Sequence, residues 1–115
     1  MRIFVEDYFL GTHQWDTCNL PEVEFLKNEH HHNFHVRIEC NIKHNDREIE
    51  FLILRIWLRK IMATKYVSLF GIIRFGSKSC EMIGEEIKYE FEKEFGKIKV
   101  KVIVSEDKIQ GGIVE

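Results

Sequence analysis

Proline occurs once, at Pro21, and the seven glycines are scattered, so the sequence contains no linker and no low-complexity tract. Cysteine is scarce too, and three widely spaced cysteines do not make a disulfide framework. No apolar run reaches the roughly 18 residues of a membrane-spanning helix. Acidic residues follow residues 1–5 too early for a signal peptide, so we expect a cytoplasmic protein.

The chain also lacks a strong charge of either sign. The formal net charge is −2 and the sequence pI is about 6.3, which gives no electrostatic reason to expect a nucleic acid or an anionic membrane as partner. Hydrophobic residues make up 44% and charged residues 31% of the sequence. This composition and a length of 115 residues predict a single globular domain spanning residues 1–115.

Hydrophobic periodicity predicts an α+β domain of four strands and two helices. Residues 34–42 alternate apolar and polar side chains, which is typical of a strand with one buried face in an antiparallel sheet. Further strands are expected at 2–10, 98–104 and 109–114. The order β-β-α-α-β-β then gives a four-stranded antiparallel sheet with both helices on one face.

The two helices are expected at 48–62 and 79–95, and they differ in pattern. Cys80, Ile83, Ile87 and Phe91 form one stripe on the second helix, which Ser77 or Ser79 can cap and Gly96 can end. The first helix is apolar nearly all round, so it requires cover on more than one side, from the sheet and from another subunit.

Histidines gather at the start of the second strand. In an extended chain, residues two apart project to the same side, so His30 and His32 can offer two imidazoles to one ion. His13, just past the first strand, is the candidate for a third ligand. The alternative is a solvated loop of histidines that binds no metal.

The cysteines allow two interpretations. Cys18 is near enough in sequence to act as a fourth ligand or a nucleophile, and otherwise it is a small residue in a loop. Cys40 and Cys80 lie on apolar faces and are predicted to belong to the core.

Several segments together resemble the 6-pyruvoyl-tetrahydropterin synthase and 6-carboxytetrahydropterin synthase family. Residues 9–13, Phe-Leu-Gly-Thr-His, resemble the family's Phe-x-Ala-Ala-His, and residues 30–38, His-His-His-Asn-Phe-His-Val-Arg-Ile, resemble His-Gly-His-Asn-Tyr-x-Val-x-Val. Weaker similarities lie at 49–55, at 79–83 and at 102–106 with 111–114. All five occur in the family's order and cover most of the chain.

The resemblance implies a tunnelling fold, in which antiparallel sheets of several subunits join into a barrel, here a homotrimer or homohexamer. It implies that His13, His30 and His32 bind Zn²⁺. It also implies that Glu106 and Ser79 bind the substrate, dihydroneopterin triphosphate or a related guanine-derived pterin. The Glu106 carboxylate would anchor the pterin ring through two parallel hydrogen bonds, unless it is an ordinary turn residue.

Two departures from the family bear on activity. The family's catalytic cysteine precedes the first histidine of the pair by four residues, where this chain has Leu26, so only a rearranged loop would bring Cys18 to the metal. The family's Asp-His pair has no counterpart at 62–76. The sequence therefore supports a zinc-dependent pterin synthase and, as alternatives, a non-catalytic metal- and pterin-binding protein on the same fold or a structural domain whose histidines bind nothing.

Overall fold

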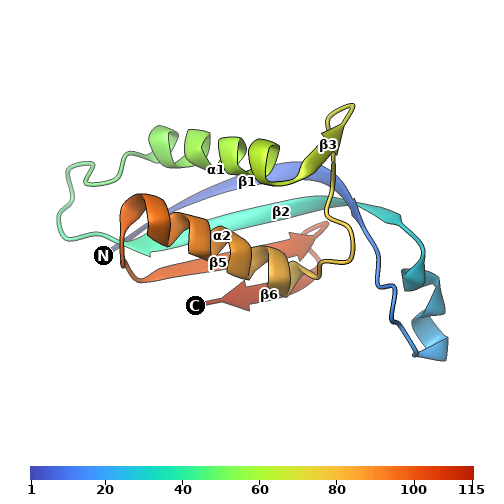
Figure 1. Ribbon diagram of the computed structural model, residues 1–115. Helices are drawn as coiled ribbons and strands as arrows, with labels where there is room; N and C mark the ends of the chain where they lie inside the picture. The colour runs from blue at the N-terminus through green and yellow to red at the C-terminus, as the bar shows by residue number, and fades with distance from the viewer.

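The computed structural model describes residues 1–115 and contains a six-stranded sheet in the order β3-β4-β1-β2-β5-β6. Figure 1 shows the two long central strands, β1 and β2, running past the helices at one end of the molecule. The strands are β1 (Arg2–His13), β2 (His30–Asn41), β3 (Val67–Leu69), β4 (Ile72–Arg74), β5 (Val100–Glu106) and β6 (Gln110–Val114). The helices are η1 (Pro21–Lys27), a 3₁₀ segment, with α1 (Phe51–Lys65) and α2 (Cys80–Phe95).

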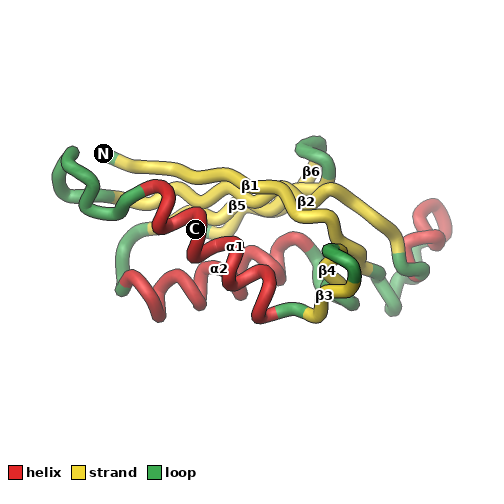
Figure 2. Tube along the Cα trace, turned by 90° about the horizontal axis from the view of Figure 1, so that it is seen from above, coloured by secondary structure: helices red, strands yellow, loops and turns green.

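The core lies between the sheet and the two α-helices, which pack on the same side of it (Figure 2). On β2, Val36, Ile38 and Cys40 face the helices with no exposed surface, as the alternation predicted. Strand β2 pairs antiparallel with β1 on one side and with β5 on the other. The predicted strand pattern is confirmed here, although β1 ends later and β2 begins earlier than expected, so that both strands include the histidines.

Helix α2 matches its prediction closely. Its apolar stripe is buried, Ser79 Oγ accepts a hydrogen bond from Met82 N as the N-cap, and Gly96 ends the helix with a positive φ of 89°. A left-handed φ suits glycine, which lacks a Cβ.

Helix α1 begins and ends three residues later than expected, and one side of it contacts the core through Leu54, Trp57, Leu58 and Met62. Four further apolar side chains in the first two turns of α1, Phe51, Leu52, Ile53 and Ile56, are exposed. We call these four residues the α1 apolar patch. None of the helices has the length and apolar character needed to span a membrane.

The predicted four-stranded antiparallel sheet is wrong in strand number and in direction. Two additional strands of three residues each, β3 and β4, form a hairpin after α1, and β4 pairs parallel with β1, so the sheet is mixed. The hairpin escapes a periodicity analysis because each strand is too short to alternate. All three residues of β3 are also exposed, so no buried face marks it.

Candidate metal centre

His13, His30 and His32 lie together at the end of the β1–β2 ladder, and we call them the three-histidine cluster. His13 pairs directly with His30 across the two strands, and His32, two residues on, projects to the same face of the sheet. One ring nitrogen from each residue lies within 4.8 Å of the other two. The structure therefore brings the three predicted ligands to one point.

The orientation of each ring is fixed through its Nδ1 atom. His13 Nδ1 lies 2.9 Å from the Lys78 carbonyl oxygen, and His30 Nδ1 lies 2.8 Å from that of Asn28. His32 Nδ1 lies 2.9 Å from a carboxylate oxygen of Asp107. Because all three partners are acceptors, each Nδ1 carries the proton, and each Nε2 is left with a lone pair for a metal.

The environment of His13 fits a metal ligand. Its Nε2 atom is buried and has no hydrogen-bond partner, which is costly unless a ligand satisfies it. Burial lowers the pKa of the imidazole, although the Lys78 carbonyl and Glu106 oppose the shift. The neutral ring that results is the metal-binding form of histidine.

Glu106 reaches the same point from the end of β5. Its Oε1 lies 3.0 Å from His13 Nε2 and its Oε2 lies 3.5 Å from His32 Nε2. Val100, Val102 and Val104 of β5 are buried, and Glu106 continues their parity on the helix-facing side. That parity is the sequence signal for its position, whereas the resemblance indicated only a ring-binding role.

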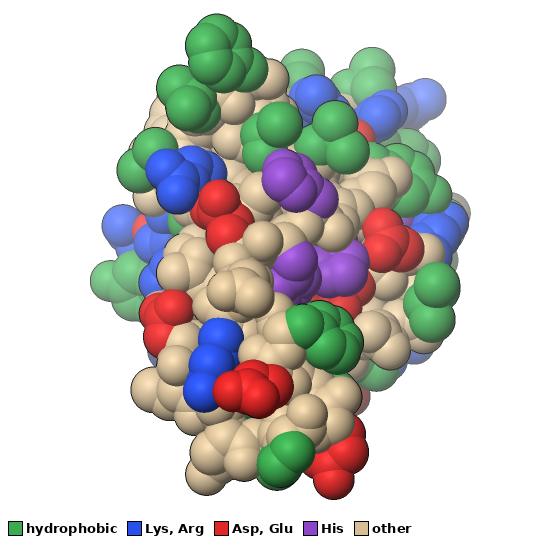
Figure 3. All heavy atoms as spheres, turned by 90° about the vertical axis from the view of Figure 1, so that its right-hand side faces the viewer, with side chains coloured by type: hydrophobic (Ala, Val, Ile, Leu, Met, Phe, Trp, Pro, Cys, Tyr) green, Lys and Arg blue, Asp and Glu red, His purple; other side chains and the backbone are tan.

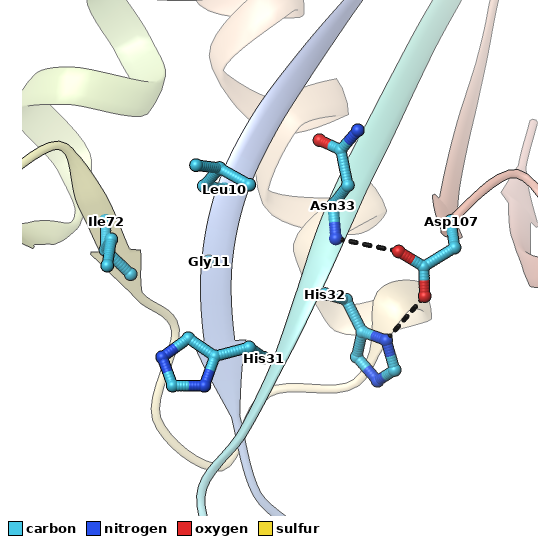
Figure 4. A pocket seen from close by; sticks show the side chains of 7 residues that line it. All are labelled: Leu10, Gly11, His31, His32, Asn33, Ile72 and Asp107. Carbon is cyan, nitrogen blue, oxygen red and sulfur yellow. Dashed lines mark hydrogen bonds and ion pairs between the residues drawn. The ribbon is translucent and has the colours of Figure 1, made fainter.

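Asp107 is a functional candidate that sequence reasoning missed. Its carboxylate accepts hydrogen bonds from His32 Nδ1 and from the backbone N–H of Asn33, both at 2.9 Å (Figure 4). These bonds, the backbone one first, lower the pKa of Asp107 and keep it ionised. Only its place in a polar turn beside Glu106 marks it in the sequence.

A cavity of about 540 Å³ opens beside the cluster. It is lined by His13 and His30 from the cluster, by Glu106, and by Ser79, Cys80 and Glu81 at the start of α2. Burial, reinforced by Glu106 and Glu81, raises the pKa of Cys80 to about 12, so this thiol stays protonated and is a poor nucleophile. The predicted substrate-binding residues Ser79 and Glu106 thus line one cavity with His13 and His30.

Cys18 lies elsewhere in the loop that contains η1. It is only 2% exposed, and its thiol points to the carbonyl oxygens of Leu20 and Val23 at 3.9 and 3.6 Å. It lines a separate, smaller cavity of about 180 Å³. As predicted from their sequence position, Cys40 and Cys80 are buried in the core.

His31 and His35 point away from the cluster. His31 projects to the other side of the β1–β2 ladder from His32 (Figure 4), and His35 is buried on that outer face against Glu6. Figure 3 shows histidine side chains gathered on the end of the molecule with acidic side chains around them.

Comparison with known proteins identifies the fold. No protein-family model matches the chain, and no curated protein sequence matches it significantly. Solved structures do match. Two variants of Plasmodium vivax 6-pyruvoyltetrahydropterin synthase, in which a catalytic glutamate is replaced by cysteine or alanine, align with TM-scores of 0.65 and 0.66 at 20% and 19% identity. The Plasmodium falciparum 6-pyruvoyl tetrahydropterin synthase aligns with a TM-score of 0.66 at 18% identity.

Each of these alignments covers 99% of this chain and 96% of the other. The chain therefore has the fold of these synthases over nearly its whole length, and its three-histidine cluster is a candidate metal site within that fold.

Proposed function

We propose that the chain is a zinc-dependent protein of the 6-pyruvoyl- or 6-carboxy-tetrahydropterin synthase type, which acts on dihydroneopterin triphosphate or a related guanine-derived pterin. The observation that supports this most strongly is the convergence of three Nε2 lone pairs beside a cavity that also contains a carboxylate. Imidazole nitrogens suit Zn²⁺, which when bound supplies a Lewis acid that polarises an oxygen of the substrate.

The residues of the chain would then position the substrate. Glu106 can accept two parallel hydrogen bonds from a ring N–H and an exocyclic amino group, an arrangement that selects guanine-like edges. Ser79 accepts from Met82 N and keeps its own hydroxyl proton for a ligand in the cavity. Glu106 and Ser79 thus offer an acceptor and a donor to a pterin ring.

The proposal needs a general base, and Cys18 is the candidate. Its thiol faces carbonyl groups of its own loop, so it reaches the metal only if that loop rearranges. In the Plasmodium vivax enzyme the residue described as catalytic is a glutamate, so a catalytic residue on this fold need not be a cysteine. If Cys18 serves here, Cys18→Ala abolishes turnover while the zinc content stays at the wild-type level.

The second candidate function is a non-catalytic protein that binds zinc and a pterin. It is favoured by Leu26 at the family's cysteine position and by the lack of aspartate and histidine at 62–76. General acid–base help is worth about 10²- to 10⁴-fold in rate, so its loss leaves a poor enzyme that can still bind.

One experiment separates the two candidates. Zinc-loaded protein is mixed with dihydroneopterin triphosphate, and pterin binding and product formation are both measured, with His30→Ala as the metal-deficient control. Turnover that depends on His30 supports the synthase. Binding without turnover supports the second candidate, and the absence of both metal and pterin binding contradicts the whole proposal.

A further inference from the structure

We propose that Glu106 is the fourth ligand of the metal held by the three-histidine cluster, so that the pterin-free site is closed. This inference deepens the proposed function and rests on its metal site. It assigns Glu106 a role that a ring-anchoring residue does not have, and it makes metal affinity depend on a residue of β5.

The distances match a shared metal. Ligand atoms at about 2.0–2.1 Å from a tetrahedral zinc lie about 3.3–3.4 Å from one another. The two carboxylate oxygens of Glu106 lie 3.0 and 3.5 Å from the Nε2 atoms of His13 and His32, on either side of that value. The carboxylate thus lies within reach of a metal that His13 and His32 would hold.

With His13 neutral, the close contact between Glu106 and His13 Nε2 is unfavourable unless a cation joins them. His13 Nδ1 donates its proton to the Lys78 carbonyl, so Nε2 presents a lone pair, and Glu106 Oε1 presents another at 3.0 Å. Two acceptors at this distance repel unless a cation lies between them. The contact also lacks hydrogen-bond geometry, since His13 Nε2 has no hydrogen-bond partner.

The charge of Glu106 also lacks compensation. Its side chain is only 18% exposed, and no lysine or arginine lies within ion-pair distance of it. Its one hydrogen-bond donor is the side-chain amide of Gln110, at 3.2 Å. A half-buried carboxylate beside the imidazole lone pairs of His13 and His32 is a set of groups that a divalent cation satisfies and that a proton satisfies only in part.

The backbone around Glu106 holds it in this place. Glu106 pairs with Phe34 of β2, and the next residue, Asp107, is bonded to both His32 and Asn33. The end of β5 is therefore tied to the strand that supplies two of the histidines. Glu106 reaches the cluster without a change in the backbone.

A four-ligand site differs in function from a three-ligand site. Structural zinc sites use four protein ligands, whereas catalytic sites keep one position open for water or substrate. In this chain, the guanine-like edge that binds Glu106 would take the carboxylate away from the metal and so open that position. Substrate binding and access to the metal are then linked through one side chain.

The test measures metal alone, with no pterin present. Zinc affinity is determined for the full chain by competition with a chromophoric chelator, in wild type, Glu106→Gln and Glu106→His. Glu81→Gln is the matched control, because Glu81 lines the same cavity but no imidazole lies within ion-pair distance of it. We expect Glu106→Gln to lose at least the roughly 10- to 100-fold in affinity that even an outer-shell change costs, Glu106→His to recover much of it, and Glu81→Gln to stay within about threefold.

Cobalt substitution adds a spectroscopic readout. Four-coordinate Co²⁺ absorbs visible light more strongly than the five- or six-coordinate ion, so the wild-type spectrum should weaken in Glu106→Gln as water enters, and recover in Glu106→His. Equal zinc affinities and equal cobalt spectra for Glu106→Gln and Glu81→Gln would overturn the inference. Because no pterin is used, that result would leave the proposed substrate untouched, and a lack of pterin turnover would leave this test unaffected.

Discussion

At the scale of single residues, Asp7 is the one buried acidic side chain in the molecule. It projects from β1 toward α1, where Arg59 Nη1 donates to its Oδ2 at 2.6 Å and Arg55 Nε does so at 3.3 Å. Burial raises the pKa of Asp7, but the hydrogen bonds from Arg59, the Tyr8 N–H and Arg55 outweigh it, and the net shift is downward. The ionised carboxylate therefore links β1 to α1.

This link predicts a pH-dependent contribution to stability. The folded-state pKa lies below the unfolded value of about 3.9, so the contribution is fully present above that pH and is lost as the pH falls through the folded-state pKa. We expect Asp7→Asn to lower the free energy of unfolding at pH 7 by about 1 to 2 kcal/mol. That is less than the cost for a fully buried pair, because both arginines stay half exposed.

Urea unfolding at pH 7 and at pH 3 measures this difference. The penalty of Asp7→Asn should shrink at pH 3, where the wild-type carboxylate begins to take up a proton. Asp46→Asn is the control, since Asp46 pairs only with the equally exposed Arg47 and should change stability by less than about 0.5 kcal/mol at either pH. An undiminished penalty at low pH would show that packing, and not charge, holds Asp7.

Single residues also differ in how well the sequence predicts their place in the candidate site. His30 and His32 follow from side-chain alternation alone, and the resemblance supplied the family role of His13. The direct pairing of His13 with His30 depends on strand register, which the sequence does not encode locally. Asp107 could not be found, because it reaches His32 only through the pairing of β5 with β2.

At the scale of elements, α2 shows which features a sequence determines well. Its stripe, its N-cap and its terminal glycine all act within a few residues, so they can be read without knowledge of the rest of the chain. The β3–β4 hairpin is the opposite case. It exists because β4 pairs with the distant β1, and nothing within its own short strands requires that pairing.

Ser79 connects this element to the site, because one hydroxyl caps α2 and lines the cavity. We expect Ser79→Ala to lower the free energy of unfolding by about 1 kcal/mol, the usual cost of losing an N-cap, and Ser79→Thr to retain most of the stability. Ser77→Ala is the matched control, since Ser77 lines the same cavity but does not cap the helix. Chemical denaturation measures all three, and equal stability of Ser79→Ala and Ser77→Ala would contradict the role of the cap.

At the scale of the whole molecule, the α1 apolar patch is a surface that a single chain leaves exposed to solvent. Its four side chains are each between 56% and 63% exposed and lie on one helix. Large exposed apolar patches are uncommon on monomers. It fits the expectation from the sequence that the first helix requires cover from a second subunit.

We therefore expect self-association at micromolar concentration, consistent with the proposed trimer or hexamer. Light scattering coupled to size exclusion should give a mass above the 13.8 kDa of one chain. Ile56→Glu should reduce that mass, because it places a charge within the patch. Ala63→Glu, at an exposed position of the same helix outside the patch, should leave it unchanged. A monomeric wild type would contradict this prediction.

The pairing of His13 with His30 also has a consequence for the order of folding. All three imidazoles belong to a single hairpin, β1–β2, which is complete at Asn41, whereas Glu106 joins it from the far end of the chain. A metal ion can thus clamp two neighbouring strands before the helices and β5 are in place, and a clamp of this kind lowers the entropy of the unfolded chain. We expect Zn²⁺ to accelerate refolding from urea in stopped-flow measurements. The ion would then nucleate the sheet during folding as well as occupy the three-histidine cluster in the folded protein.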